Sequence, residues 1–311
     1  MITETQLNED FPAGRFAPSP TGRMHLGNIY TALLSWLSVK SRGGRWILRI
    51  EDLDPQRSRR AYAEQIEDDL RWLGLSWDEG GLGDLGPHGP YSQSRRGDIY
   101  HRDLCRLAER SLLYPCTCTR ADILSAQAPH QSDGRIVYQG RCRPAVMHPL
   151  SPDEMPGHTL RLKVEDRDIM FTDKICGEQC VNLRDHCGDF VVQRADGVCA
   201  YQLAVVIDDA LMGVTEVMRG DDLLLSTAQQ LYLYELLGYI PPVYAHLPLI
   251  RNEAGQRLSK RDKSLSMETL RSEFSPEELL GRIAHLAGLR DNDCPITLDG
   301  MLELWSEQNI T

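Results

Sequence analysis

Near the N-terminus, short apolar runs alternate with stretches in which apolar residues recur every three or four positions. This alternation predicts strands and helices. A short apolar run at residues 14–20 ("GRFAPSP") predicts a buried strand that enters a turn. Apolar side chains recur every three or four positions in residues 25–44, which predicts a helix ended by two glycines. Residues 45–54 predict a second strand, and residues 57–75 a second helix capped by Gly74. This β-α-β-α order is typical of a parallel sheet with helices packed on it.

The pattern changes after the second helix. Residues 78–94 are predicted to form a loop and residues 96–114 a helix. Residues 114–146 are rich in Cys, Pro and Gly and show little periodicity, which is typical of a small insert that needs a cross-link. Residues 158–218 carry strand-like runs, and one of them is the run at 201–209 ("YQLAVVIDD").

Helix and strand patterns return after Gly220. A helix is predicted at 226–239 and a strand at 243–250, so the α/β domain resumes after a long insertion. The tail is acidic and helical in pattern. We therefore expect four segments: the first half of the α/β domain at 1–113, an insertion at 114–218, the second half at 219–264, and a helical C-terminal subdomain at 265–311.

Composition narrows the class of protein. Of the 311 residues, 41% are apolar and 25% are charged, as in ordinary globular proteins. The net charge of −11 argues against unspecific nucleic-acid binding, although it leaves a folded RNA partner open. The N-terminus carries no secretory signal pattern, and Asp208 and Asp209 interrupt the most apolar window. We expect a cytoplasmic protein with no membrane partner, and a monomer, because no long coiled-coil pattern is present.

One candidate ligand site lies directly after the first predicted strand. In α/β sheets, ligands bind beyond the carboxyl ends of strands, near helix N-termini. The stretch at 18–28 ("PSPTGRMHLGN") offers Gly22 and Gly27 for close backbone approach. It also offers His25 and Asn28 as donors to phosphate oxygens. Taken alone, the stretch fits an ordinary Pro-rich turn equally well.

A second candidate is the basic stretch "RLSKRDKS" at 257–264. Its Lys260 could place a positive charge on a developing pyrophosphate, although a solvated basic loop has the same composition. The two motifs together, at opposite ends of one α/β fold, are far more specific than either alone.

The two motifs carry a family resemblance. "PSPTGRMHLGN" resembles the HIGH motif of class I aminoacyl-tRNA synthetases, in the form used by the glutamyl branch. "RLSKR" resembles their KMSKS loop, with Arg257 and Leu258 in place of Lys and Met. "RIEDLD", "GPYSQS" and the run from Tyr201 to Gln230 are also similar to glutamyl-tRNA synthetase segments. The resemblance implies a Rossmann-like parallel sheet, an inserted small zinc-binding segment, a β-rich acceptor-type insertion, and a short helical C-terminal subdomain without an anticodon-binding domain.

The resemblance also implies the chemistry. The α-carboxylate of glutamate would attack the α-phosphorus of ATP, and an RNA hydroxyl would then take the glutamyl group. His25 and Lys260 would be the catalytic residues. Mg²⁺ would accompany ATP. The residues implied to hold ATP are Pro18, His25, Gly27, Asn28, Ser259 and Lys260.

Glutamate brings two carboxylates and one ammonium, and arginine suits carboxylates because its fork can donate two parallel hydrogen bonds. The residues implied to bind glutamate are Arg15, Phe16, Ala17, Pro18, Ser19, Glu51, Tyr201 and Arg219, with Glu51 facing the ammonium.

Two alternatives remain open at this site. Arg219 could form a structural ion pair with Asp221 or Asp222. Glu51 could join its neighbouring aspartates in a divalent-metal cluster, although successive strand residues point to opposite faces. The carboxylates of that alternative are Glu51, Asp52 and Asp54.

The chain has nine cysteines and no pattern of a disulfide framework, so reduced thiols or metal ligands are expected. Cys116, Cys118 and Cys142 lie in the core-poor insert and predict a structural zinc ion. The spacing leaves the fourth ligand open, with His130 and Cys105 as candidates, and a metal-free insert is the alternative.

The resemblance favours a tyrosine as the fourth zinc ligand, since zinc-bearing relatives use a Cys-x-Cys, Tyr-x-x-x-Cys set. This set matches Cys116, Cys118, Tyr138 and Cys142. A second group, Cys176, Cys180 and Cys187, is expected to be buried or free.

The sequence stops at Thr311, soon after the basic stretch, whereas glutamyl-tRNA synthetases continue into an anticodon-binding domain. The resemblance is therefore to a short branch of the family that attaches glutamate to queuosine in the anticodon of tRNA(Asp). That branch is implied to activate glutamate without tRNA. The alternatives are a minimal enzyme that charges tRNA(Glu), an ATP-dependent glutamate ligase with a non-RNA acceptor, and a non-catalytic binding module.

Overall fold

The computed structural model describes residues 11–119, 122, 137–250 and 265–308. The chain folds into two compact units, which alternate along the sequence. The first unit comprises Met1–Arg95, Met212–Asp222 and Pro242–Thr311, and the second comprises Arg96–Leu211 and Leu223–Pro241.

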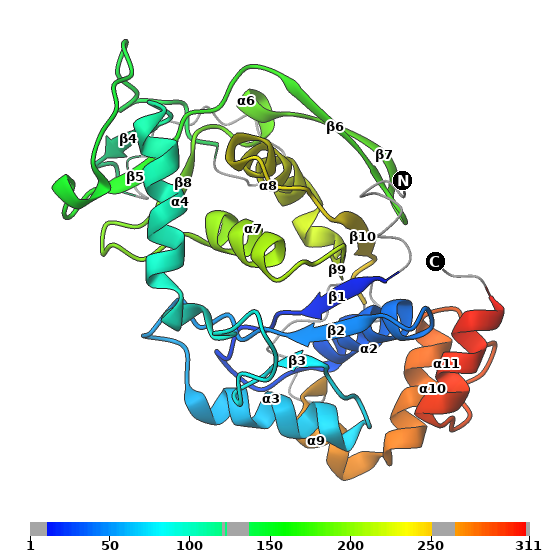
Figure 1. Ribbon diagram of the computed structural model, residues 1–311. Coiled ribbons are helices and arrows are strands. Elements are labelled where there is room, and N and C mark those ends of the chain that lie inside the picture. The colour runs from blue at the N-terminus through cyan, green and yellow to red at the C-terminus, as the bar shows by residue number, and fades with distance from the viewer. Residues whose placement is uncertain (1–10, 120–121, 123–136, 251–264, 309–311) are drawn as a thin grey trace. The chain divides into compact units, whose positions relative to one another are not determined.

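A five-stranded sheet forms the centre of the first unit, and all of its pairings are parallel. The strand order is β10-β9-β1-β2-β3 (Figure 1). This arrangement confirms the predicted parallel sheet. The strands are β1 (Ala13–Phe16), β2 (Arg45–Leu48), β3 (Glu79–Gly80), β9 (Glu216–Gly220) and β10 (Val243–Leu247).

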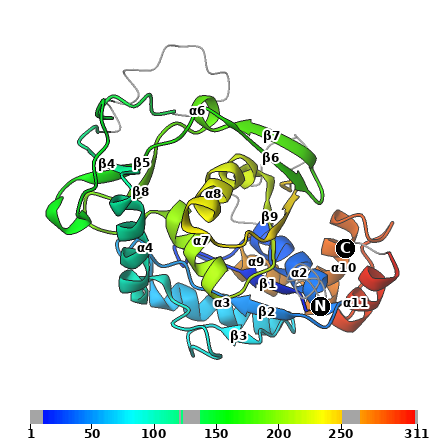
Figure 2. The same ribbon diagram turned by 45° about the horizontal axis from the view of Figure 1, so that its top comes forward.

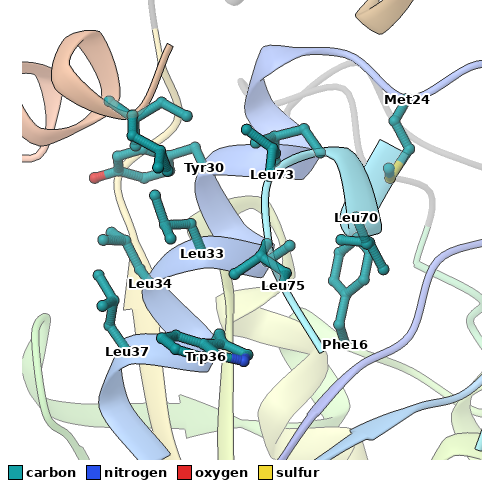
Figure 3. Close-up of a cluster of buried hydrophobic side chains, with 14 of the residues drawn as sticks. Phe16, Met24, Tyr30, Leu33, Leu34, Trp36, Leu37, Leu70, Leu73 and Leu75 are labelled. Carbon is teal, nitrogen blue, oxygen red and sulfur yellow. The ribbon is translucent and has the colours of Figure 1, made fainter. Parts of the chain in front are cut away.

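The helices of the first unit surround an apolar core. Helix α2 buries Leu33 and Leu37 in the same cluster as Leu70 and Leu73, as Figure 3 shows. Gly14 permits the close approach of α2 to β1, because a Cβ there would lie 2.8 Å from Val39 Cγ1. The helices are α2 (Leu26–Lys40), α3 (Arg60–Trp72), α9 (Met267–Glu273), α10 (Pro276–Leu286) and α11 (Leu298–Glu307), with a 3₁₀ turn η1 (Gln93–Arg95).

The helical tail packs on this core as part of the first unit. Met301 and Trp305 of α11 are buried in the cluster that α2 also lines. Helix α10 begins with a capping box, in which Ser275 and Glu278 each accept a hydrogen bond from the other's backbone N–H. The prediction of a helical subdomain after residue 265 is therefore right about its secondary structure.

The second unit combines short antiparallel sheets with helices. Strands β4, β5 and β8 form one sheet, and β6 and β7 form a hairpin (Figure 2). Its strands are β4 (Leu113–Cys116), β5 (Thr159–Leu162), β6 (Asp168–Asp173), β7 (Gly177–Asn182) and β8 (Phe190–Gln193). Its helices are α4 (Gly97–Glu109), α6 (Leu183–His186), α7 (Tyr201–Leu211), α8 (Leu224–Leu237) and the 3₁₀ turn η2 (Pro152–Glu154); a further 3₁₀ turn, η3 (Asp221–Leu223), spans the boundary between the units.

Three local predictions are wrong. The run at 201–209 is helical, because a continuous apolar segment does not distinguish a buried helix from a strand. The predicted loop at 78–94 contains β3, whose partner β2 is distant in sequence. The helix predicted through residue 114 ends earlier, since Ser111 has a left-handed φ of 58° and Leu113 already starts β4. Among the residues that the structure describes, no helix is long and apolar enough to cross a membrane.

Candidate active site

One face of the parallel sheet carries the candidate glutamate residues. Gly14 is paired with Glu216, and successive side chains of a strand point to opposite faces. Arg15 and Arg219 therefore share the face opposite Phe16 and Met218, which belong to the apolar cluster of α2. Each arginine is only 5% exposed. The register thus brings two buried guanidinium groups to one face, although they lie about 200 positions apart.

Glu51 follows β2 and stays hydrogen-bonded to the chain that leaves β1. The backbone N–H groups of Arg49 and Glu51 donate to the carbonyl oxygens of Phe16 and Pro18, at 3.0 Å each. Arg49 Nη2 lies 3.2 Å from Glu51 Oε1, and both side chains are buried. Sequence reasoning missed Arg49. Its signal was a charged residue two positions from Glu51, on the same face of an extended segment.

Arg219 has a defined partner on the neighbouring strand. Its Nε donates to His246 Nε2 at 3.0 Å, and its Cζ lies 5.1 Å from the ring centroid of Tyr244. His246 is fully buried. Sequence reasoning missed this histidine as well, although a lone imidazole inside the apolar run 243–250 was a detectable anomaly.

The remaining candidates for glutamate binding differ in how accessible their side chains are. The side chain of Phe16 stacks on Trp46 in the core, so only its backbone is available to the polar face. Ala17 is half-buried, Pro18 is buried and Ser19 is exposed. Tyr201 is the first residue of α7 in the second unit and is 36% exposed.

Three candidate ATP residues, His25, Gly27 and Asn28, lie at the start of α2. His25 immediately precedes the helix, and its backbone N–H donates to Asn28 Oδ1 at 3.1 Å. A Cβ on Gly27 would lie 3.2 Å from His25 Cε1 and Nδ1, so glycine keeps room for the imidazole. This helix start has the N–H groups and dipole that favour an anion.

The chain that follows the basic stretch is attached to this helix start. Ser266 forms an antiparallel bridge with His25, and the N–H of Met267 donates to the carbonyl of Met24 at 2.9 Å. Ser259 and Lys260 themselves lie outside the described residues.

A second candidate site lies in the second unit, where the ligand atoms of three cysteines lie within 4.8 Å of one another. Cys118 Sγ is 3.4 Å from Cys142 Sγ. Tyr138 Oη lies 3.5 Å from Cys116 Sγ and 3.9 Å from Cys118 Sγ, and it accepts the N–H of Cys142 at 2.7 Å. The four residues named from the sequence are thus brought together.

The surroundings of this cluster shift the pKa values of its side chains in different directions. Burial raises the pKa of the Tyr138 phenol and of the Cys118 thiol. Burial also opposes ionisation of Cys142, but hydrogen bonds, first from Tyr138, lower its pKa to about 6. The cluster therefore favours ionisation of Cys142 over ionisation of Cys118.

Buried polar groups contact Tyr138 and form hydrogen bonds with one another beside the cluster. Arg161 Cζ lies 3.8 Å from the ring centroid of Tyr138, and Arg161 donates to the carbonyl of Asp189 at 2.8 Å. The Asp189 carboxylate accepts hydrogen bonds from Tyr114 and Arg143.

The other cysteines considered as metal ligands lie outside this cluster. Cys105 lies on α4 beside His101, 3.4 Å from its Nε2, and His130 is outside the described residues. Cys176 and Cys180 are exposed and Cys187 is half-buried.

The carboxylates near Glu51 do not form a metal cluster. Asp52 accepts hydrogen bonds from Ser94, Asp54 from Arg57, and Glu51 from Arg49. Within the described part of the chain, the three cysteines are the group of side chains that could share an ion.

A parallel α/β domain with an anion-binding helix start and a polar sheet face is the architecture of class I tRNA synthetases. Residues 13–298 match the family described as tRNA synthetases class I (E and Q), catalytic domain. A glutamate tRNA ligase from Elizabethkingia meningosepticum, solved with its amino acid, superposes with a TM-score of 0.79 at 32% identity. That match covers 94% of this chain and 64% of the ligase, so this chain spans less than two thirds of it. Methionyl-tRNA synthetase of Mycobacterium tuberculosis shares the fold alone, with a TM-score of 0.51 at 10% identity.

Curated relatives narrow the family further. The chain is 49% identical to a glutamyl-Q tRNA(Asp) synthetase of Symbiobacterium thermophilum, over 94% of this chain and 91% of the relative. It is 42% identical to a glutamyl-Q tRNA(Asp) synthetase of Deinococcus radiodurans, over 94% and 96%. The chain belongs to the class I tRNA synthetases, in the glutamyl-Q tRNA(Asp) synthetase family.

Proposed function

We propose that this protein activates L-glutamate with ATP and transfers the glutamyl group to queuosine in tRNA(Asp), acting as a monomer. The observation that carries the proposal is the pair of buried arginines on the polar sheet face. The relatives named above, each of which aligns with 94% of this chain, support the choice of acceptor.

The polar face suits glutamate because its charges are complementary to the substrate. Arg15 and Arg219 bind the two carboxylates, and Glu51 faces the ammonium, with the backbone of residues 16–19 beside them. Tyr201 stays a glutamate-binding residue that the resemblance alone implies. A hydrogen bond between charged groups contributes about 1.5–3 kcal/mol, so two arginine forks supply enough free energy to hold a small amino acid.

The helix start suits ATP because activation needs positioning and charge stabilisation and no protein nucleophile. The substrate's own α-carboxylate forms the new bond to phosphorus, and pyrophosphate leaves with the electron pair of the broken bond. Pro18, His25, Gly27 and Asn28 hold the nucleotide at the N-terminus of α2, and Mg²⁺ neutralises phosphate charge. Ser259 and Lys260 stabilise the leaving pyrophosphate; the bond between Met24 and Met267, close behind them in sequence, supports this placement.

Cys116, Cys118, Tyr138 and Cys142 are proposed to bind one structural zinc ion. Tetrahedral zinc with Zn–S bonds of about 2.3 Å separates neighbouring sulfur atoms by roughly 3.8 Å. The two sulfur atoms of Cys118 and Cys142 lie 3.4 Å apart, close to that value. Tyr138 Oη lies 3.5 and 3.9 Å from Cys116 Sγ and Cys118 Sγ, near the roughly 3.5 Å between an oxygen and a sulfur ligand that a Zn–O bond of about 2.0 Å gives. Bound zinc would supply a cross-link where the apolar cluster contains little more than Tyr114, Cys116 and Tyr138.

The test is a charging assay with labelled glutamate and three RNAs: tRNA(Asp) with queuosine, the same tRNA without it, and tRNA(Glu). Label on the first RNA alone supports the proposal. Label on tRNA(Glu) favours a minimal glutamyl-tRNA synthetase instead. Pyrophosphate exchange with glutamate but no label on any RNA favours a ligase with a non-RNA acceptor.

A further inference from the structure

We propose that His246 is a positioning residue for Arg219. Its Nε2 accepts the hydrogen bond from Arg219 Nε and thereby fixes the plane of the guanidinium that meets the glutamate carboxylate. The inference rests on the proposed function, because it gives Arg219 a substrate, and it adds a residue that the sequence motifs do not include.

Strand register builds the contact. β9 and β10 are parallel, and Arg219 is paired directly with His246. Their side chains therefore leave the sheet on the same face, side by side. The bond between Arg219 Nε and His246 Nε2 is 3.0 Å long, and the two residues are 5% and 0% exposed. The long, flexible side chain of Arg219 is thus held by the shorter side chain of His246, whose backbone is fixed in the sheet.

The rings of β10 reinforce this orientation. Tyr244 lies two positions before His246 and shares its face, with ring centroids 6.0 Å apart and planes inclined by 12°. The Tyr244 ring is also 5.1 Å from Arg219 Cζ. The guanidinium is planar, so a bond at Nε together with an adjacent aromatic ring determines where its two Nη groups point.

The hydrogen bond also defines the state of the imidazole. Guanidinium has donors only, so His246 Nε2 must accept with its lone pair and the ring proton must lie on Nδ1. A neutral acceptor orients the guanidinium without cancelling its positive charge. A carboxylate at position 246 would orient it equally well but would neutralise the charge that the substrate carboxylate needs.

A matched pair of variants distinguishes a role of His246 in orienting Arg219 from a role in packing alone. His246→Gln and His246→Met place side chains of similar length at the site, and only glutamine keeps an acceptor. We expect His246→Met to raise the KM for glutamate about tenfold to a hundredfold, as for a lost hydrogen bond to a charged group. His246→Gln should restore KM to within about threefold of the wild type, and the KM for ATP should change less than about twofold in both. Equal effects of the two variants, or parallel changes in both KM values, would overturn the proposal.

Two further measurements keep the outcomes distinct. Calorimetric binding of glutamate alone reports the ratio of Kd values for the Gln and Met variants without any chemical step. A wild type that binds glutamate but forms no adenylate would refute the proposed function, while the Kd ratio still decides the role of His246. A wild type that binds no glutamate overturns both. Long-range ¹H–¹⁵N NMR of the wild type needs no variant, and a proton found on Nε2 of His246 contradicts the proposal.

Discussion

The polar face of the parallel sheet and the cysteine cluster of the second unit position their functional side chains in opposite ways. On the sheet, Arg15, Arg219 and His246 start from strands whose register is set by backbone hydrogen bonds and by the apolar core on the other face. In the second unit, Cys116 ends a four-residue strand, and Cys118 and Cys142 themselves lie outside helices and strands.

The charged residues of the sheet face are positioned by the fold, whereas the residues of the cysteine cluster stabilise the fold. The sheet can order its charged groups without needing stability from them, because the apolar core packs against its other face. The cysteine cluster has almost no core, so its ligands must contribute the stability that a metal supplies. Changes on the sheet face should therefore damage binding, and changes in the cluster should damage folding of the second unit.

The largest effect is expected from Cys142→Ser, which removes one of three thiols from the cluster. Zinc content should fall from about one ion per chain to almost none, because a tetrahedral structural site needs all its ligands. Thermal unfolding should begin at a lower temperature. Atomic absorption and calorimetry measure the two quantities.

Cys176→Ser is the control for this change, since Cys176 is exposed on the β6–β7 hairpin. Equal zinc content in both variants would show that the cluster does not bind the ion.

Arg219→Ala should be the most damaging change on the sheet face. It removes a buried cation from the glutamate site, so the KM for glutamate should rise about a hundredfold or more, with the KM for ATP little changed. Arg282→Ala, on an exposed position of α10, serves as the control. An unchanged KM for glutamate in Arg219→Ala would assign Arg219 a structural role.

Glu79→Gln tests whether the sheet has a polar cross-link of its own. Glu79 on β3 accepts hydrogen bonds from Arg45, His88 and Tyr91. Burial opposes ionisation, yet these hydrogen bonds, first from His88, keep the pKa of Glu79 below its usual value. The substitution should lower the free energy of unfolding by about 2 kcal/mol at pH 7, measured by urea titration.

The pH dependence of that difference has a definite sign. A carboxyl group with a lowered pKa stabilises the fold fully above its ordinary pKa, and the contribution is lost as the pH falls through the lowered value. The gap between wild type and Glu79→Gln should therefore stay constant from pH 7 to about 5 and shrink in more acidic solution. A gap that widens on acidification would contradict this account.

The smallest effect is expected from Gly27→Ala. Its new Cβ would crowd the His25 imidazole at 3.2 Å, so the ring must shift, and the KM for ATP should rise about fivefold. Gly97→Ala is the control, because Gly97 lies outside the candidate ATP residues and a Cβ there meets nothing within 4 Å. The comparison fails if both alanines have the same effect.

The sequence analysis predicted the parallel sheet and α2 because their signals are local: hydrophobic period, helix caps and turn residues. It named Arg15, Glu51 and Arg219 through resemblance, and the register places Arg15 and Arg219 on one face. It missed the contact between Arg219 and His246, because this contact depends on strand pairing across 27 positions. It misread α7 because burial on all sides removes the helical period from an apolar segment.

The same reasoning explains the cluster. Cys-x-Cys spacing identified the first two thiols, and the resemblance named Tyr138 and Cys142, although their contacts depend on a chain reversal. The contact of Arg161 with Tyr138 comes from another strand and was not predicted.

The most direct test of the proposed function uses queuosine-containing tRNA(Asp) from which the 3′-terminal adenosine has been removed. With ATP, Mg²⁺ and labelled glutamate, the protein should label this RNA as fully as intact tRNA(Asp), because the proposed acceptor is the modified anticodon base. Loss of the label together with the 3′-terminal adenosine would contradict the account and place the glutamyl group at the ordinary acceptor end.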